Sequence, residues 1–207
     1  KWFNLLGIPK ATAPVKNGYT TWYNYYPNIN ETIVNHDLEA LSKVDADIDI
    51  FQIDDGYQTN VGDWLSVDVK KSPCGMKVIA DKIHKKGMQA GLWLAPFAAQ
   101  YVSEVAKAHP DWIIRHKSGK PGRCGLNWGG FYALDIENPE VREHIRHFFD
   151  IVLNDWGYDL VKLDFLYAAA IIPNHGKTRG QLMCEAMDFL RECVGEKQML
   201  GCGVPMM

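Results

Sequence analysis

The octapeptide YDLVKLDF (Tyr158–Phe165) has the pattern of a buried strand that ends in charged residues. Short apolar runs rich in Leu and Val are typical of strands that a parallel sheet buries on both faces. Two earlier segments, DIFQID (Asp49–Asp54) and MQAGLWLA (Met88–Ala95), and a later one, MLGCGV (Met199–Val204), share this pattern. An aromatic and β-branched segment, YTTWYNY (Tyr19–Tyr25), predicts a strand before them. The sequence therefore indicates five strands.

Segments with helical spacing of apolar residues separate these strands. The helices that we expect are, in chain order, Ile33–Val44, Gly75–Lys86, Pro139–Trp156 and Thr178–Val194. Between the second and third of them, the extended pieces Trp112–His116 and Phe131–Leu134 predict a hairpin inserted in a loop. Strands that alternate with helices predict a parallel sheet, either an open doubly wound sheet or a (β/α)8 barrel of the TIM type. The first strand-to-helix junction lacks the glycine fingerprint that would favour the open sheet.

The composition is that of an ordinary globular domain and argues against several classes of partner. Among 207 residues, 47% are hydrophobic and 23% charged, and the net charge is -3. We therefore expect neither nucleic acid nor a membrane as a partner, because no basic face and no apolar run of about 20 residues is present. The sequence contains five cysteines without CxxC spacing, which predicts free thiols. The N-terminal KWFNLL lacks a signal-peptide pattern. Together these features predict a cytoplasmic location.

Carboxylates gather at the predicted carboxyl ends of the strands, where parallel α/β folds place their sites. Asp164 and Lys162 are two residues apart on one strand, so both side chains point to the same face. A cation so close keeps a carboxylate ionised, as a glycosidase nucleophile requires, although a structural ion pair would have the same spacing. Asp54 and Asp55 can accept hydrogen bonds from sugar hydroxyls, hold a divalent metal, or belong to a simple turn.

Aromatic side chains make up 12% of the sequence and suit a site that stacks on sugar rings. Trp22, Trp93, Tyr57 and Trp64 lie near strand ends and either face a ligand or pack the core; we expect Trp22 and Trp93 to be the ligands. Cys202, at the end of the fifth strand, is either a pocket contact or a buried thiol.

Metal and cofactor sites are not indicated by the sequence. His144 and His147 are three residues apart on a helix, but that helix is predicted to lie outside the sheet, so a solvated face is the better interpretation. No set of histidines falls at the strand ends. We therefore expect neither a metal nor a cofactor.

Taken in order, the segments GYTTWYNYY, FQIDDGYQTNVGDW, GMKVIADKIHKKGMQAGLWLAP, HPDW, LDIENPEVREHI and YDLVKLDF resemble the α-galactosidases of glycoside hydrolase family 36 and, more distantly, those of family 27. The resemblance runs from Gly18 to Val204. It implies a catalytic (β/α)8 barrel, a retaining mechanism and terminal α-D-galactosyl residues as substrate. In the resembled family no metal or other cofactor is needed.

The resemblance also implies a role for each candidate residue. Asp164 matches the catalytic nucleophile, and Asp54 and Asp55 match the pair that binds the 4- and 6-hydroxyls of galactose. Lys162 matches a ligand of the sugar hydroxyls. Trp22 matches an aromatic wall of the galactose subsite, and Cys202 matches a cysteine beside the sugar.

Four departures from the family pattern line the implied subsite. Many members have Gly-Trp-x-Ser-Trp at the first strand, Glu-Pro after the third, Asn after the nucleophile and Cys-x-Ser-Gly-Gly-Gly-Arg after the fifth. The corresponding segments here are Gly18–Trp22 (GYTTW), Ala95–Phe97 (APF), Phe165-Leu166 and Cys202–Pro205 (CGVP). The natural oligosaccharide and its aglycone therefore stay open.

The acid/base carboxyl of the family follows the sixth barrel strand, and only five strand units are predicted here. Five units of about 40 residues fall short of the roughly 250 residues that an eight-unit barrel takes. We expect residues 1–207 to be a partial catalytic barrel domain that is inactive alone. The remaining strands, or a partner chain in an oligomer, would cover its open side, and any accessory β-domains would lie elsewhere.

Two other function classes stay open at the level of sequence. The first is a non-catalytic carbohydrate-binding barrel fragment, in which the acids only contact hydroxyls. The second is a metal-dependent hydrolase that uses Asp54, Asp55 and Asp164. The sequence alone does not exclude either.

Overall fold

A computed structural model describes Leu5, Gly7 and residues 14–204 of the chain. Its main element is a parallel sheet of five strands in the order β1-β2-β3-β7-β8. The strands are β1 (Gly18–Thr20), β2 (Ile50–Ile53), β3 (Gln89–Leu94), β7 (Leu160–Leu163) and β8 (Gln198–Gly201). The rest of the N-terminal KWFNLL, and Pro205 of the departure named above, lie outside the described residues.

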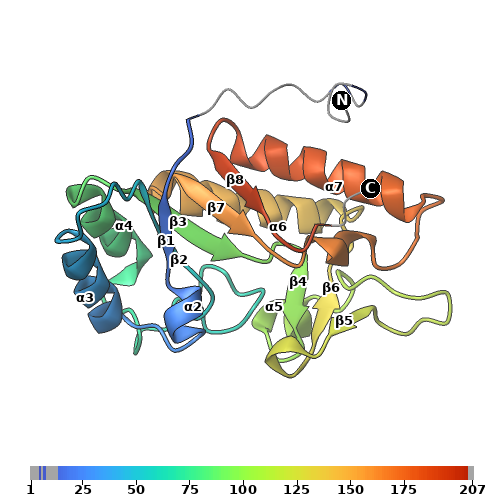
Figure 1. The fold of residues 1–207 in the computed structure, drawn as a ribbon. Coiled ribbons are helices and arrows are strands. Elements are labelled where there is room, and N and C mark those ends of the chain that lie inside the picture. The colour runs from blue at the N-terminus through green and yellow to red at the C-terminus, as the bar shows by residue number, and fades with distance from the viewer. Residues whose placement is uncertain (1–4, 6, 8–13, 205–207) are drawn as a thin grey trace.

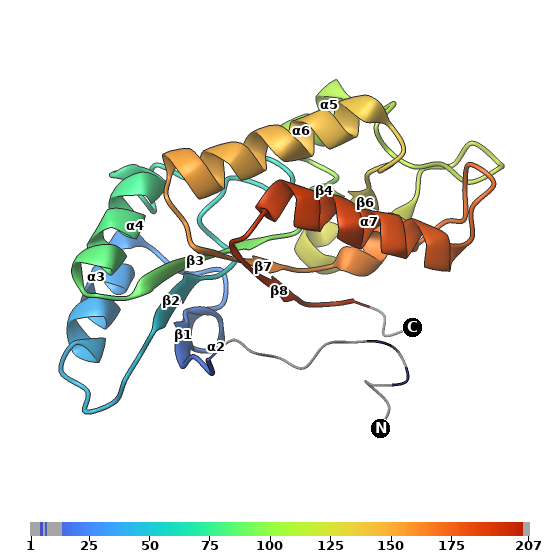
Figure 2. The same cartoon turned by 90° about the horizontal axis from the view of Figure 1, so that it is seen from above.

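Four helices connect these strands: α3 (Glu31–Leu41), α4 (Gly75–Lys85), α6 (Pro139–Asp150) and α7 (Arg179–Val194). Seen from above, they lie along one side of a curved sheet (Figure 2). A doubly wound sheet carries helices on both faces, whereas a barrel carries them only on the outside. The fold is therefore that of part of a TIM-type barrel.

The helix termini follow from local sequence. The Asn30 side chain accepts a hydrogen bond from the Ile33 amide at the start of α3. Thr178 and Gln181 form a reciprocal capping box at the start of α7. Pro139 occupies the first turn of α6, where its missing amide proton costs nothing, and a π-helical segment, Ile151–Asp155, extends that helix. The helices expected from the sequence are confirmed to within a few residues.

A small antiparallel sheet is inserted between β3 and α6 (Figure 1). Its strands are β4 (Ala98–Gln100), β5 (Arg123–Gly125) and β6 (Phe131–Ala133), in the order β4-β6-β5, and the short helix α5 (Glu104–Ala108) follows β4. The strand expected at Phe131–Leu134 is confirmed. Trp112–His116 forms no continuous strand, but an isolated antiparallel bridge joins Ile113 to Leu134, so the predicted pairing of the two pieces is confirmed in part. The ladders of β6 itself run to β4 and β5.

The first strand is shorter than its aromatic sequence predicts. The ladder ends at Thr20, and Trp22–Tyr25 forms the one-turn helix α2. The Tyr25 amide donates to the Thr21 carbonyl and the Tyr26 amide to that of Trp22, which closes the turn. Strand propensity measures how a side chain packs on a pleated surface, and here the chain leaves that surface after Thr20.

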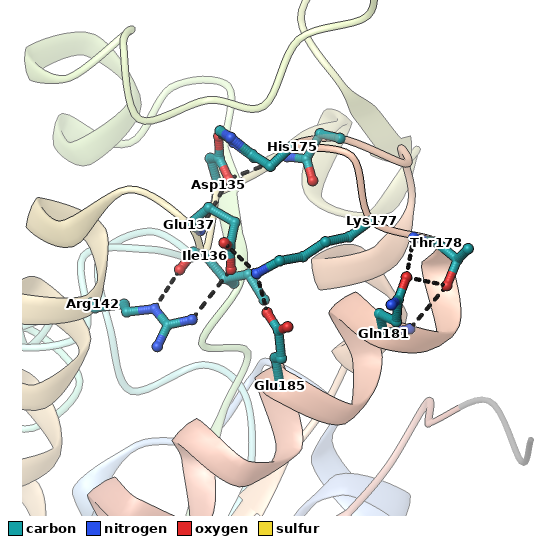
Figure 3. A network of polar contacts seen from close by, with 10 residues as sticks. Asp135, Ile136, Glu137, Arg142, His175, Lys177, Thr178, Gln181 and Glu185 are labelled. Carbon is teal, nitrogen blue, oxygen red and sulfur yellow. Dashed lines mark hydrogen bonds and ion pairs between the residues drawn. The ribbon is translucent and has the colours of Figure 1, made fainter.

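A polar network ties the start of α6 to the segment before α7 (Figure 3). Lys177 Nζ lies 2.6 Å from both Glu137 Oε2 and Glu185 Oε2. Arg142 donates to the Ile136 carbonyl and to Glu137, and His175 Nε2 lies 3.0 Å from Asp135 Oδ2. We call this set of ion pairs the outer network. It fixes the loops that follow β6 and β7 relative to each other.

Within the part of the chain that is described, no helix combines the length and the apolar character needed to span a bilayer.

Candidate active site

A cavity of about 110 Å³ lies where β1, β2, β3 and β7 end. It is lined by Trp22, Asp54, Asp55, Trp93, Asn127, Trp128, Lys162, Asp164 and Phe165. Six of the seven residues that the sequence nominates are in this list. The seventh, Cys202, follows β8 and lies beside Asp164: burial raises the pKa of its thiol, and the Asp164 carboxylate adds to that effect.

Asp54 is the most deeply buried of the cavity acids, with 2% of its surface exposed. Its Oδ2 accepts hydrogen bonds from Lys162 Nζ at 2.7 Å and from Gln52 Nε2 at 3.0 Å, and its Oδ1 accepts one from the Asp55 amide. The expectation that Lys162 acts on Asp164 is thereby corrected. The lysine extends past β3, which lies between β2 and β7, and pairs with the carboxylate that is buried most.

Asp55 is also buried, and both of its carboxylate oxygens are engaged. Gln58 Nε2 donates to Oδ1 at 2.6 Å, and the indole nitrogen of Trp128 donates to Oδ2 at 2.7 Å. Burial raises the pKa of Asp55, and these two hydrogen bonds oppose that rise. Each oxygen keeps a further lone pair, so the carboxylate can still accept a hydroxyl from a ligand.

Asp164 is held at the end of β7 by two donors. The Phe165 amide donates to its Oδ1 at 2.7 Å, and the indole nitrogen of Trp93 donates to its Oδ2 at 3.2 Å. Phe165 has a φ of 52°, so the chain turns sharply directly after the acid. These two hydrogen bonds, one to each oxygen, fix the direction of the carboxylate.

Three cavity residues remain: Phe165, which the sequence indicates only as a departure from the family pattern, and Asn127 and Trp128, which were not predicted. Trp128 and Asn127 belong to a turn between β5 and β6, so the inserted sheet brings them to the barrel mouth. No periodic pattern marks such a turn. One signal was available, because Trp128 is the one large aromatic residue in the polar, glycine-rich loop His116–Gly130.

Other aromatic candidates belong to the core. Tyr57 and Trp64 are buried, and neither is among the cavity residues. Trp64 packs edge-on against Trp93, with ring centroids 5.7 Å apart, so it supports a cavity wall from behind.

The two α6 histidines differ from each other. His147 is exposed, as expected of a solvated face. His144 instead packs against Trp112, and burial lowers the pKa of its imidazole, so the solvated interpretation is wrong for this residue. No cluster of three or more His, Cys, Asp or Glu side chains with metal-site geometry occurs among the residues that the structure describes.

The fold and the cavity together define one class of protein, a TIM-type barrel with carboxylates and indoles at the carboxyl ends of its strands. Within that class, the family model described as Melibiase matches residues 17–186. The chain belongs to the Melibiase family.

Several relatives of the chain are α-galactosidases. It is 29% identical over 150 residues to α-galactosidase Mel36A of Lactobacillus acidophilus, and the match covers 69% of this chain and 20% of that protein. It is 38% identical to the TtGalA α-galactosidase of Thermus thermophilus, solved with p-nitrophenyl α-D-galactopyranoside, with a TM-score of 0.85 over 95% of this chain and 40% of that one.

The family 36 α-galactosidase AgaA of Geobacillus stearothermophilus has the same fold, with a TM-score of 0.74 and 22% identity, over 91% of this chain and 28% of that one. The chain thus spans about a fifth of the length of the curated relative and less than half of the solved ones.

Proposed function

We propose that the chain is part of the catalytic barrel of a retaining α-galactosidase and cleaves terminal α-D-galactosyl residues within the full-length protein. The observation that carries this proposal is the convergence of three aspartates, one lysine and three tryptophans on one cavity. The complexes of TtGalA with p-nitrophenyl α-D-galactopyranoside and with stachyose support an α-galactoside as substrate.

In the proposed reaction, Asp164 is the nucleophile. Its carboxylate oxygen forms a bond to the anomeric carbon while the bond to the leaving oxygen breaks, which gives a covalent glycosyl-enzyme. Water then attacks the same carbon and gives a proton to the second carboxyl group, while the bond to the Asp164 oxygen breaks; the two inversions leave the configuration retained. The hydrogen bonds from Phe165 and Trp93 direct the carboxylate before the attack.

The other cavity residues hold the sugar. Asp54 and Asp55 accept hydrogen bonds from its hydroxyls, and Lys162 donates one while it neutralises Asp54. Trp22 and Trp93 form apolar walls for the ring faces. Cys202 contacts the sugar from the end of β8. A sugar without one of these hydroxyls loses a hydrogen bond to a buried, charged acid, so this arrangement discriminates against it.

A retaining enzyme needs a second carboxyl group about 5–5.5 Å from the nucleophile to protonate the leaving oxygen. Asp54 and Asp55 are the other carboxylates of the described cavity, and their oxygens already accept bonds from Lys162, Gln58 and Trp128. We infer that the acid/base comes from outside this chain. The 207-residue chain alone should then not hydrolyse nitrophenyl α-galactoside, and detectable turnover would contradict the inference.

Two further parts of the proposal concern partners and location. β1 and β8 each have one neighbour among the described strands, so the strands that close the barrel have to come from the rest of the protein or from a partner chain. All five cysteines are free thiols, which supports a cytoplasmic location.

Covalent labelling tests the proposed function most directly. The full-length protein is treated with an activated fluoro-galactoside, which forms a slowly hydrolysed glycosyl-enzyme, and the labelled peptide is mapped. We expect the label on Asp164, none on the Asp164→Asn variant, and much slower labelling by the matching fluoro-glucoside, which differs at the 4-hydroxyl. Galactose binding without any label would instead favour a non-catalytic sugar-binding protein.

A further inference from the structure

Trp128 has a backbone conformation that large side chains rarely adopt. Its φ is 55° and its ψ is 26°, in the left-handed region, and two glycines with positive φ, Gly129 and Gly130, follow it. The turn is held from outside, because Gln100 Nε2 donates to the Trp128 carbonyl at 2.8 Å. Such a conformation persists where surrounding contacts fix it, and it is found most often at functional sites.

The turn brings the indole into contact with both halves of the cavity. On one side, its nitrogen donates to Asp55 Oδ2 at 2.7 Å. On the other side, its ring packs edge-on against Trp93, which donates to Asp164, and against Phe165, which follows Asp164. One side chain of the inserted sheet therefore contacts both Asp55 and the aromatic residues beside the proposed nucleophile.

We propose that Trp128 is a positioning residue of the sugar site, which orients the Asp55 carboxylate and so makes the inserted sheet part of galactoside recognition. The proposal rests on the function proposed above for its reference to a galactoside. The contact with Asp55 stands on geometry alone.

The charge environment of Asp55 shows why this donor matters. Burial and Asp54 disfavour the ionised carboxylate, whereas Gln58, Trp128 and Lys71 favour it. Lys71 is itself held by the carbonyls of Pro27 and Gly56, and Gln58 is part of the same loop as Asp55. Trp128 is thus the one donor to Asp55, among these, that the inserted sheet provides. Its loss would raise the pKa of Asp55 further.

The test compares Trp128→Phe with Trp112→Phe in the full-length protein. Trp112 is buried, whereas Trp128 is partly buried, and the Trp112 indole N–H likewise donates a hydrogen bond to a carboxylate, Glu140 Oε2 at 3.0 Å, but outside the cavity. Both variants therefore lose the same kind of hydrogen bond. Each is assayed for the pH profile of kcat/KM with nitrophenyl α-galactoside, and the Asp55 carboxyl is titrated by carbon NMR, with Asp55→Asn used to assign the signal.

For Trp128→Phe we expect kcat/KM to fall roughly tenfold or more, the size of a lost hydrogen bond to a charged group, with most of the loss in KM. The acid limb of the profile and the NMR titration of Asp55 should both move to higher pH. Trp112→Phe should leave the limb and the titration in place. If the two variants behave alike in both measurements, the proposal is wrong.

Two additions separate the remaining outcomes. Gln100→Leu removes the donor that holds the turn but keeps the indole, so a smaller change in the same direction is expected even if Trp128→Phe folds poorly; an unchanged limb and titration would count against the proposal. If the wild-type protein does not cleave the galactoside, the proposed function fails. The Asp55 titration then decides separately whether Trp128 positions this acid.

Discussion

Two clusters of charged side chains in this molecule contain similar residues, but one lies in the buried cavity and the other is partly exposed to solvent. In the cavity, the Lys162–Asp54 pair has side chains that are 16% and 2% exposed. In the outer network, the Lys177–Glu185 pair is 30% and 38% exposed. Charges lose little solvation at the surface and gain little from pairing, whereas buried charges depend on their partners. The cavity is therefore arranged for a ligand, and the outer network for support of the loops around it.

The pKa directions express the same difference. Burial raises the pKa of Asp55 above its ordinary value of 3.8, so the folded state disfavours the charged acid. Hydrogen bonding to Lys177 lowers the pKa of Glu137 below its ordinary value of 4.5, so the folded state favours the charged acid. At neutral pH, Asp55 reduces the stability of the fold and Glu137 adds to it.

The largest expected contrast is in catalysis. Asp164→Asn in the full-length protein should lower kcat by about a thousandfold or more, because the nucleophile is lost, while galactose affinity changes little. Glu185→Gln, which alters a carboxylate of the outer network, should retain normal kcat. The measurement is hydrolysis of nitrophenyl α-galactoside together with calorimetric titration of galactose. A normal kcat for Asp164→Asn would show that the nucleophile is another residue.

The next contrast is in stability. Lys162→Met leaves Asp54 buried without its cation, which should cost about 3–5 kcal/mol of unfolding free energy. Lys177→Met removes a cation from the outer network and should cost much less, because solvent replaces it. Urea unfolding of both variants measures the difference. Equal losses would mean that burial does not separate the two clusters.

A smaller effect is expected from the donor to the proposed nucleophile. Trp93→Phe removes the indole hydrogen bond to Asp164 Oδ2 but keeps an aromatic ring in the wall. A hydrogen bond to a charged group is worth about 1.5–3 kcal/mol, so kcat/KM should fall by roughly ten- to a hundredfold. Steady-state kinetics measures the loss, and thermal unfolding checks that the variant is folded. Unchanged kinetics would indicate that the Phe165 amide alone directs the acid.

The smallest effects should appear in the pH dependence of stability. Because the pKa of Asp55 is raised in the folded state, this residue lowers the unfolding free energy. The loss is complete above the folded pKa and absent below 3.8. Asp55→Asn should therefore be more stable than the wild type at neutral pH but not at acid pH. Since the pKa of Glu137 is lowered, its contribution is full above 4.5 and is lost as pH falls through the folded pKa. Glu137→Gln should therefore lose stability at neutral pH and converge with the wild type in acid. At neutral pH, the change in unfolding free energy relative to the wild type should be positive for Asp55→Asn and negative for Glu137→Gln. The same sign for both variants would contradict the comparison.

The sequence predicts the barrel units well because their signals are local. Apolar runs such as Leu160–Leu163 and caps such as Asn30 and Thr178 depend on neighbours within a few residues. The carboxyl ends of parallel strands meet at one rim, so the position of Asp54 and Asp164 in the chain was enough to bring both to the cavity.

What the sequence did not predict depends on long-range contacts. The partner of Lys162 is 108 positions away in the chain, and Trp128 reaches Asp55 over a separation of 73. Strand propensity also misled at Trp22–Tyr25, because the hydrogen bonds of a tight turn replaced the ladder there. No pattern within a single segment encodes such contacts.

The order of the parallel sheet has a consequence for synthesis of the chain. In the parallel sheet, β2, β3, β7 and β8 each pair with the strand of that sheet that precedes them in the sequence. The sheet can therefore form in the order in which the ribosome synthesises its strands. The longest loop to close lies between β3 and β7, and the inserted sheet shortens it by folding on its own local contacts. The rim that carries Asp54, Asp55 and Asp164 can then form as soon as β7 and the residues directly after it have been made.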